Sequence, residues 1–159
     1  MRTVTLDTNV ADRRDGDVIE AAQRRGLEVT VVPMTDREMR LSNYRPGVDA
    51  RISDAFVLAY CQLGTMALAS SEILEQILHI IGNGSFPKPD CRHDLMNGQR
   101  RQFRDALILA AHGRKRRDIF VSDDRKAFVK HGRREKLEHL LRTCIITSSK
   151  FLQWAEEDS

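Results

Sequence analysis

The fold is decided by Ile119-Phe120-Val121-Ser122-Asp123-Asp124, a short apolar run that stops abruptly at three polar residues. Such a run is typical of a buried strand, and similar runs predict further strands at residues 4–6, 27–32 and 143–146. Helical periodicity fills the intervening chain, at residues 18–25, 53–63, 68–81, 101–112, 136–142 and 148–157. Short strands that alternate with helices predict an α/β fold, a three-layer sandwich whose central, mostly parallel sheet is flanked by helices.

Composition favours one soluble domain that spans residues 1–159. The chain is 41% hydrophobic and 31% charged, and no repeat or long linker divides it. No apolar run approaches the roughly 20 residues that cross a bilayer, and Asp7 places an acid too early for a signal peptide, so we expect a cytoplasmic protein without a membrane segment. The three cysteines lack a CxxC spacing and are expected to be reduced thiols rather than zinc ligands.

Positive charge is concentrated in the second half of the chain. Residues 1–80 carry 9 Lys and Arg against 12 Asp and Glu, a net −3, whereas residues 81–159 carry 17 against 11, a net +6. A basic half favours a polyanionic partner, although a solvated helical surface has the same composition. Charge alone leaves both interpretations open.

Acidic residues follow the predicted strands. Asp7 ends the first strand, Glu38 comes after the second, and Asp124 comes after the third. Asp105 directly precedes the apolar run 106–111, on the predicted helix before the third strand. In a parallel sheet the carboxyl ends of the strands share one edge, and four clustered carboxylates repel one another unless a divalent cation binds them. Mg²⁺ and Mn²⁺ prefer such oxygen ligands and promote phosphodiester hydrolysis.

Five segments in order resemble the motifs of PIN-domain ribonucleases. The stretch 6–10, Leu-Asp-Thr-Asn-Val, is similar to the family's opening motif, and Val31-Val32-Pro33 with Glu38 is similar to its second strand and acid. The stretch 104–111 resembles the helix of the third acid, and 119–128 resembles the Thr-x-Asp motif, with Ser122 in place of threonine and Phe128 as a buried anchor. The stretch 144–152 resembles the terminal strand and helix.

The resemblance implies a metal-dependent endoribonuclease that hydrolyses RNA with a metal-activated water. It implies that Mg²⁺ or Mn²⁺ is held by four acids: Asp7, Glu38, Asp105 and Asp124. Supporting roles are expected for Asn9, Ser122 and Asp123. Because many small PIN proteins are toxins of toxin–antitoxin pairs, a small antitoxin-like protein is an expected partner. A homodimer is also expected, since residues 53–86 could hold an extra helix pair or a dimerisation surface.

Basic residues beyond the third strand are candidates for RNA binding. Arg125, Lys126 and Lys130 follow Asp124 on the acidic edge, where they are expected to contact phosphates. The run 114–117 precedes the third strand and is expected at the opposite edge. Sparse aromatic residues give no indication of base stacking.

Each acid also has a structural interpretation. Asp7 suits a helix cap, and Asp105 suits an ion pair with Arg101 one turn earlier. Glu38 fits a capping box with Thr35, and Asp36 is its rival as second acid, because polar residues precede Glu38 where the family has apolar ones.

Alternatives remain for the cap and for the function. Asp123 and Asp124 compete to cap a helix that begins near Arg125; we assign Asp124 to the metal and Asp123 to a cap or outer shell. The alternative function is a degenerate PIN-like domain that binds RNA or a protein without cutting. A haloacid-dehalogenase phosphatase needs a second aspartate at position 9, where Asn9 stands.

Overall fold

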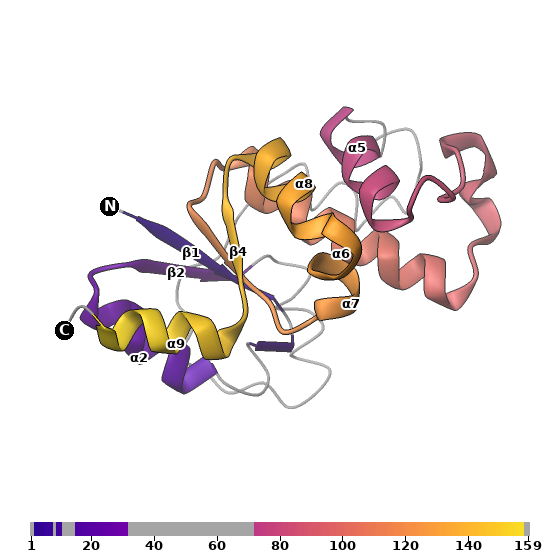
Figure 1. The fold of residues 1–159 in the computed structure, drawn as a ribbon. Helices are drawn as coiled ribbons and strands as arrows, with labels where there is room; N and C mark the ends of the chain where they lie inside the picture. Colours follow the sequence, from indigo (N-terminus) through magenta and orange to yellow (C-terminus); the bar gives the residue numbers. More distant parts are fainter. Residues whose placement is uncertain (1, 8, 11–14, 32–71, 158–159) are drawn as a thin grey trace.

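A four-stranded parallel sheet forms the centre of the protein (Figure 1). The computed structural model describes residues 2–7, 9–10, 15–31 and 72–157. Its strands are β1 (Thr3–Leu6), β2 (Glu28–Val31), β3 (Ile119–Val121) and β4 (Cys144–Ile146), in the spatial order β2-β1-β3-β4. All three pairings are parallel, so the predicted strands and the parallel sheet are confirmed.

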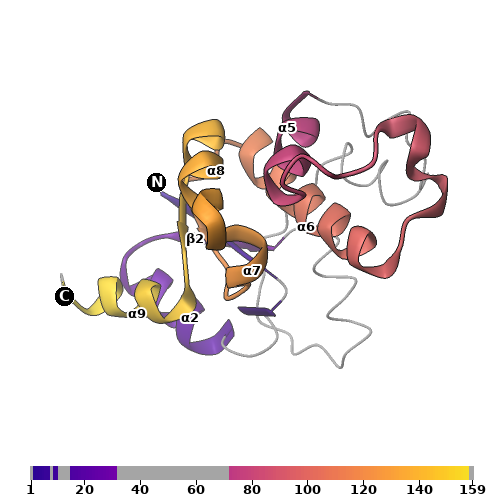
Figure 2. The ribbon, with the colours of Figure 1, turned by 45° about the vertical axis from the view of Figure 1, so that its right-hand side comes forward.

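Helices cover both faces of the sheet (Figures 1 and 2). On one face lie α2 (Asp15–Arg24) and α9 (Ser148–Glu157). On the other lie α5 (Glu72–Ile81), α6 (Asn97–Arg114) and α8 (Arg133–Leu141), together with the short α7 (Arg125–Phe128). A kinked 3₁₀ segment occupies Pro89–Asp94, and a single 3₁₀ turn occupies Lys130–Gly132. The arrangement is compatible with the predicted three-layer sandwich.

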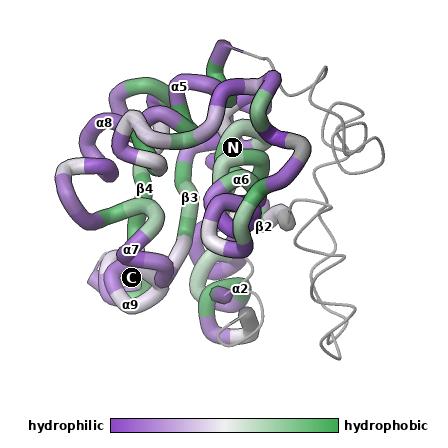
Figure 3. Tube along the Cα trace, turned by 90° about the vertical axis from the view of Figure 1, so that its right-hand side faces the viewer, coloured by the Kyte–Doolittle hydropathy of each residue, from purple (hydrophilic) through white to green (hydrophobic). Residues whose placement is uncertain are grey.

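Alternation along the strands divides the core in two. Val4 and Leu6 of β1 and Val121 of β3 face α2 and α9, whereas Phe120 and Ile145 face α6 and α8. All five side chains are at most 2% exposed, and Figure 3 colours β3 and β4 as hydrophobic. Burying each such side chain contributes roughly 1.5–3 kcal/mol, which explains why these short β-branched runs become strands.

Helix α6 is longer than the predicted 101–112. At its start the Gln99 side chain accepts the Met96 N–H at 2.9 Å, so the helix begins four residues earlier. At its end Gly113 does not stop the helix; a Cβ on Gly113 would lie 2.6 Å from Leu141, which indicates that this glycine allows α8 to approach. The residues 106–111 are all buried, as expected from their uniformly apolar character.

The other helices match their predictions less closely at their starts than at their ends: α2 begins at Asp15 rather than 18, and α8 spans Arg133–Leu141 rather than 136–142. Helix α2 stops before Gly26, whose φ of +64° and N–H bond to the Gln23 carbonyl form the expected glycine C-terminus. Helix α9 has the predicted bounds, and α5 matches the described part of the predicted helix 68–81. The predicted helix 53–63 lies outside the described residues. No helix in the described ranges is long and apolar enough to span a membrane.

A buried arginine fixes the connection between α5 and α6. Arg92 is 7% exposed, and its two terminal nitrogens donate to the Glu75 carboxylate at 2.8 and 2.7 Å. Its guanidinium also lies over the rings of Phe86 and Phe103, at 5.2 and 5.8 Å from their centroids. Because the charge of Arg92 is paired with Glu75 and its guanidinium plane lies against two aromatic rings, this residue holds the loop 82–96 against both helices.

The outer edge of β4 is occupied by a side chain from α8. The Ile145 N–H points away from β3, because the ladder bonds of β4 are made by Cys144 and Ile146. Glu138 accepts that outward N–H at 2.7 Å. A carboxylate therefore takes the place that a neighbouring strand would fill.

Candidate active site at the carboxyl edge of the sheet

Asp7 and Asp124 are linked through the hydroxyl of Ser122. Leu6 is in register with Val121, so the next residues of the two strands, Asp7 and Ser122, lie side by side. The Ser122 hydroxyl donates to Asp7 Oδ2 at 2.6 Å and accepts the Asp124 N–H at 3.1 Å. Asp7 is 4% exposed and Ser122 1% exposed, so this contact is shielded from water. Ser122, for which a supporting role was expected, thus binds a carboxylate.

Asn9 and Asp123 join neighbouring segments of the chain. The Asn9 side-chain oxygen accepts the Asp123 N–H at 3.2 Å, which fastens the end of β3 to the segment after β1. The Asp123 carboxylate accepts the N–H of Ser148 at 2.9 Å and its hydroxyl at 2.7 Å. Asp123 therefore satisfies the first residue of α9, which is a capping role as predicted, but at a different helix.

The cap of α7 is Asp124, and the expectation that Asp123 would take this role was wrong. Asp124 Oδ1 accepts the Ala127 N–H at 2.8 Å, three residues on, as an N-cap does. Asp123 is already engaged with Ser148, because α9 begins beside the end of β3. Capping uses one oxygen of Asp124, and the same carboxylate lines a pocket.

That pocket brings Asp124 together with Asp105. It has a volume of about 270 Å³ and lies between the first half of α6, the end of α5 and the segment 124–133. Asp105 reaches it from α6 and is half-buried at the start of the fully buried run 106–111. Figure 2 shows α7 beside α6, which is the arrangement that places these two acids on one cavity.

Two of the predicted acids cannot be placed. Glu38 and its rival Asp36 lie outside the described residues, so the second acid of the candidate set stays a prediction. Within the ranges that the structure describes, no three His, Cys, Asp or Glu side chains lie close enough together to hold a metal ion. Of the acids that can be placed, Asp105 and Asp124 share the pocket. The Asp7 carboxylate is linked through the Ser122 hydroxyl to the backbone N–H of Asp124, not to its carboxylate.

Positive residues also line the pocket, and sequence reasoning identified only one of them. Lys126 was a predicted RNA contact, whereas Arg101 and Arg133 were not. Arg133 is held in place by a hydrogen bond from its guanidinium to the Lys126 carbonyl. The other two predicted contacts, Arg125 and Lys130, are exposed but are not among the lining residues.

His112 fixes α6 to the sheet at the opposite end of the helix. It is fully buried, and its ring nitrogens lie 2.9 Å from the Thr5 hydroxyl and 2.6 Å from the Thr143 hydroxyl. Burial lowers the pKa of His112 to about 3; the positive charge of Arg117 adds to this, and Asp118 opposes it. The neutral ring therefore ties the helix that carries Asp105 to β1, the strand that precedes Asp7.

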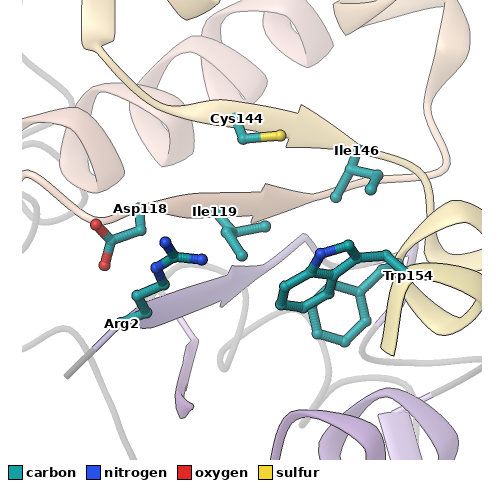
Figure 4. Close-up of a pocket in the computed structure, with 7 residues that line it drawn as sticks. Arg2, Asp118, Ile119, Cys144, Ile146 and Trp154 are labelled. Atoms are coloured by element: carbon teal, nitrogen blue, oxygen red, sulfur yellow. The ribbon is translucent and has the colours of Figure 1, made fainter. Parts of the chain in front are cut away.

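A second pocket lies at the amino edge of the sheet and contains none of the candidate acids (Figure 4). It has a volume of about 350 Å³ and is lined mainly by apolar side chains. Figure 4 shows Arg2 and Asp118 at one end and Trp154 at the other, with Ile119, Cys144 and Ile146 between them. Burial raises the pKa of the Cys144 thiol, with a further contribution from Glu138, so this thiol is not activated as a nucleophile.

Comparison with known proteins identifies no relative: no protein-family model, no curated protein and no solved structure matches the chain.

Proposed function

We propose that the protein is a divalent-metal-dependent nuclease that hydrolyses RNA at the carboxyl edge of its sheet. The observation that carries the proposal is the pocket shared by Asp105 and Asp124, to which Asp7 is connected through Ser122. Two acids far apart in the sequence thus line one pocket, and Asp7 follows β1 at the carboxyl edge, where α/β sheets place their functional groups. The order of motifs that resembles PIN-domain ribonucleases supports the same assignment.

The donor atoms suit Mg²⁺ or Mn²⁺. Asp105 and Asp124 both line the cavity, and hard oxygen ligands with room for water are what these ions prefer. In this proposal Asp7 and Glu38 complete the ligand set. When bound, the ion supplies positive charge for the phosphate and lowers the pKa of the attacking water.

The side chains of the chain itself position the reaction. The Ser122 hydroxyl donates to Asp7 Oδ2, which fixes the orientation of a buried carboxylate, and it receives the Asp124 N–H, which fixes the start of α7. The cap bond between Asp124 and Ala127 holds that carboxylate at one rotamer. Rigid placement of this kind keeps ligand atoms in a productive arrangement during catalysis.

The test is cleavage of an end-labelled, single-stranded RNA of mixed sequence in EDTA, Mg²⁺ or Mn²⁺. We expect cutting only with metal, and we expect Asp105→Asn and Asp124→Asn to lower the rate at least a hundredfold. Asparagine remains a good helix cap, so Asp124→Asn should keep the fold. The matched control is Asp118→Asn. Asp118 directly precedes β3, at the end of the strand opposite to Asp124, so this substitution should leave cutting intact.

Two results would count against a nuclease. Absence of cutting with either metal, in a protein that still binds RNA, would favour a binding domain. Full activity of Asp124→Asn would remove the metal site from this pocket.

A further inference from the structure

We infer that Arg101, Lys126 and Arg133 form a phosphate-binding triad that holds a single-stranded RNA backbone over the acidic pair. This inference rests on the proposed function, since it concerns the same pocket. The sequence predicted RNA contacts at positions 125, 126 and 130. The triad keeps Lys126 and has Arg101 and Arg133 in place of the other two. The three residues line the cavity that Asp105 and Asp124 line.

Helix geometry places one cation beside one acid. Arg101 and Asp105 are four residues apart on α6, so their side chains emerge from the same face one turn from each other. Gln102 lies next to Arg101 and lines the same cavity. A phosphate held by Arg101 would therefore lie one helical turn from the carboxylate assigned to the metal.

The turn after α7 places the other two cations. His131 and Gly132 both have positive φ, 60° and 69°, and this left-handed pair reverses the chain before α8 begins at Arg133. The reversal brings the Arg133 guanidinium back to the Lys126 carbonyl. An arginine whose side chain is already oriented loses less conformational entropy when it binds a phosphate.

The charge of the cavity favours an anion even without metal. Its lining contains three cations and two carboxylates, for a net charge of +1. No aromatic ring is among the residues that line it in the described part of the chain, so contact with the backbone rather than base stacking would hold the strand. Binding of this kind depends weakly on base identity and strongly on salt.

The experiment measures binding of a short, fluorescein-labelled oligouridylate by anisotropy in EDTA, which prevents cutting. Three phosphate contacts predict a slope of log K against log salt of about −2, from the −0.7 per contact of single strands. Arg101→Gln and Arg133→Gln should each reduce the slope by about 0.7 and weaken binding about eightfold at roughly 50 mM salt.

Matched controls separate the triad from general positive charge. Arg100→Gln and Arg134→Gln change the neighbouring positions, which do not line the pocket; Arg134 instead pairs with Glu135 and Glu138. Both should bind like the unmodified protein. Arg101→Lys should restore most of the affinity, because charge at this exposed position is what binds. Circular dichroism checks the fold of Arg133→Gln, whose bond to the Lys126 carbonyl is lost.

The outcomes distinguish this inference from the nuclease proposal. Equal losses in the triad and control variants, unchanged binding in the triad variants, or no RNA binding at all would overturn the triad. Triad-dependent binding without any metal-dependent cutting would sustain the triad and overturn the nuclease. Metal-dependent cutting that is lost in Asp105→Asn, with RNA binding unaffected by Arg101→Gln and Arg133→Gln, would sustain the nuclease and overturn the triad.

Discussion

Acidification should destabilise the protein through His112, which must stay neutral in the folded state. The imidazole is enclosed between two threonine hydroxyls and the ring of Phe120, whose centroid lies 5.3 Å away. Its pKa falls from 6.5 in the unfolded chain to about 3 in the folded protein. Above pH 6.5 neither state is protonated, and below about pH 3 both are. Between these values the unfolded chain alone takes up a proton, so the free energy of unfolding decreases as pH falls.

The magnitude follows from the difference in pKa. A difference of 3.5 units at 1.36 kcal/mol per unit corresponds to a total loss of about 5 kcal/mol, of which about 2 kcal/mol is already lost at pH 5. A domain of this kind has a total stability of about 5–15 kcal/mol. His112 is therefore expected to make a large contribution to acid unfolding.

The assay is urea unfolding followed by circular dichroism at about pH 7, 6, 5 and 4, for the unmodified protein and His112→Gln. Glutamine does not titrate, and the other groups titrate alike in both proteins. The stability advantage of the unmodified protein should therefore shrink by about 2 kcal/mol between pH 7 and pH 5. His139→Gln, an exposed position on α8, is the control and should show a constant difference. A constant difference for His112→Gln as well would refute the reasoning.

Three further substitutions test contacts around the sheet. Ser122→Ala removes the hydroxyl that donates to Asp7. It should lower the free energy of unfolding by about 1–3 kcal/mol in urea titrations, and it should reduce RNA cutting. Ser149→Ala, at an exposed site, should do neither. Arg92→Met breaks the buried pair with Glu75 and should cost about 3 kcal/mol by thermal unfolding; an additional Glu75→Met that fails to recover part of this loss would contradict the assigned pairing. Asp123→Ala leaves the first amide of α9 without its carboxylate and should cost about 1 kcal/mol; amide exchange that is unchanged at the start of α9 would argue against the cap.

Local patterns were sufficient to predict the sheet and most helices. Strand β3 could be recognised because Phe120 and Val121 are consecutive apolar residues. Consecutive residues of a strand point to opposite faces, so both are apolar when both faces of the sheet are buried. The supporting role of Ser122 could be expected from its place in the motif, and the parallel register of β1 and β3 explains why its partner is Asp7. The six apolar residues that follow Asp105 cover every side of the helix, which explains why this acid is half-buried.

Long-range contacts could not be predicted from these patterns. Which of Asp123 and Asp124 caps α7 depends on Ser148, which lies 25 residues beyond Asp123. Arg133 enters the pocket because His131 and Gly132 adopt left-handed backbone, and a histidine in that conformation has no reliable sequence signal. Arg101 did have one, its four-residue spacing from Asp105, but this spacing predicts a surface ion pair equally well.

The carboxylate of Glu138 at the outer edge of β4 has a consequence for behaviour at high concentration. Exposed edge strands are templates on which further chains add and grow into fibrils. Here the outward Ile145 amide is already bonded, and an incoming chain would first have to displace a negatively charged group. The same side chain that completes a hydrogen bond thus opposes the addition of another strand at this amide.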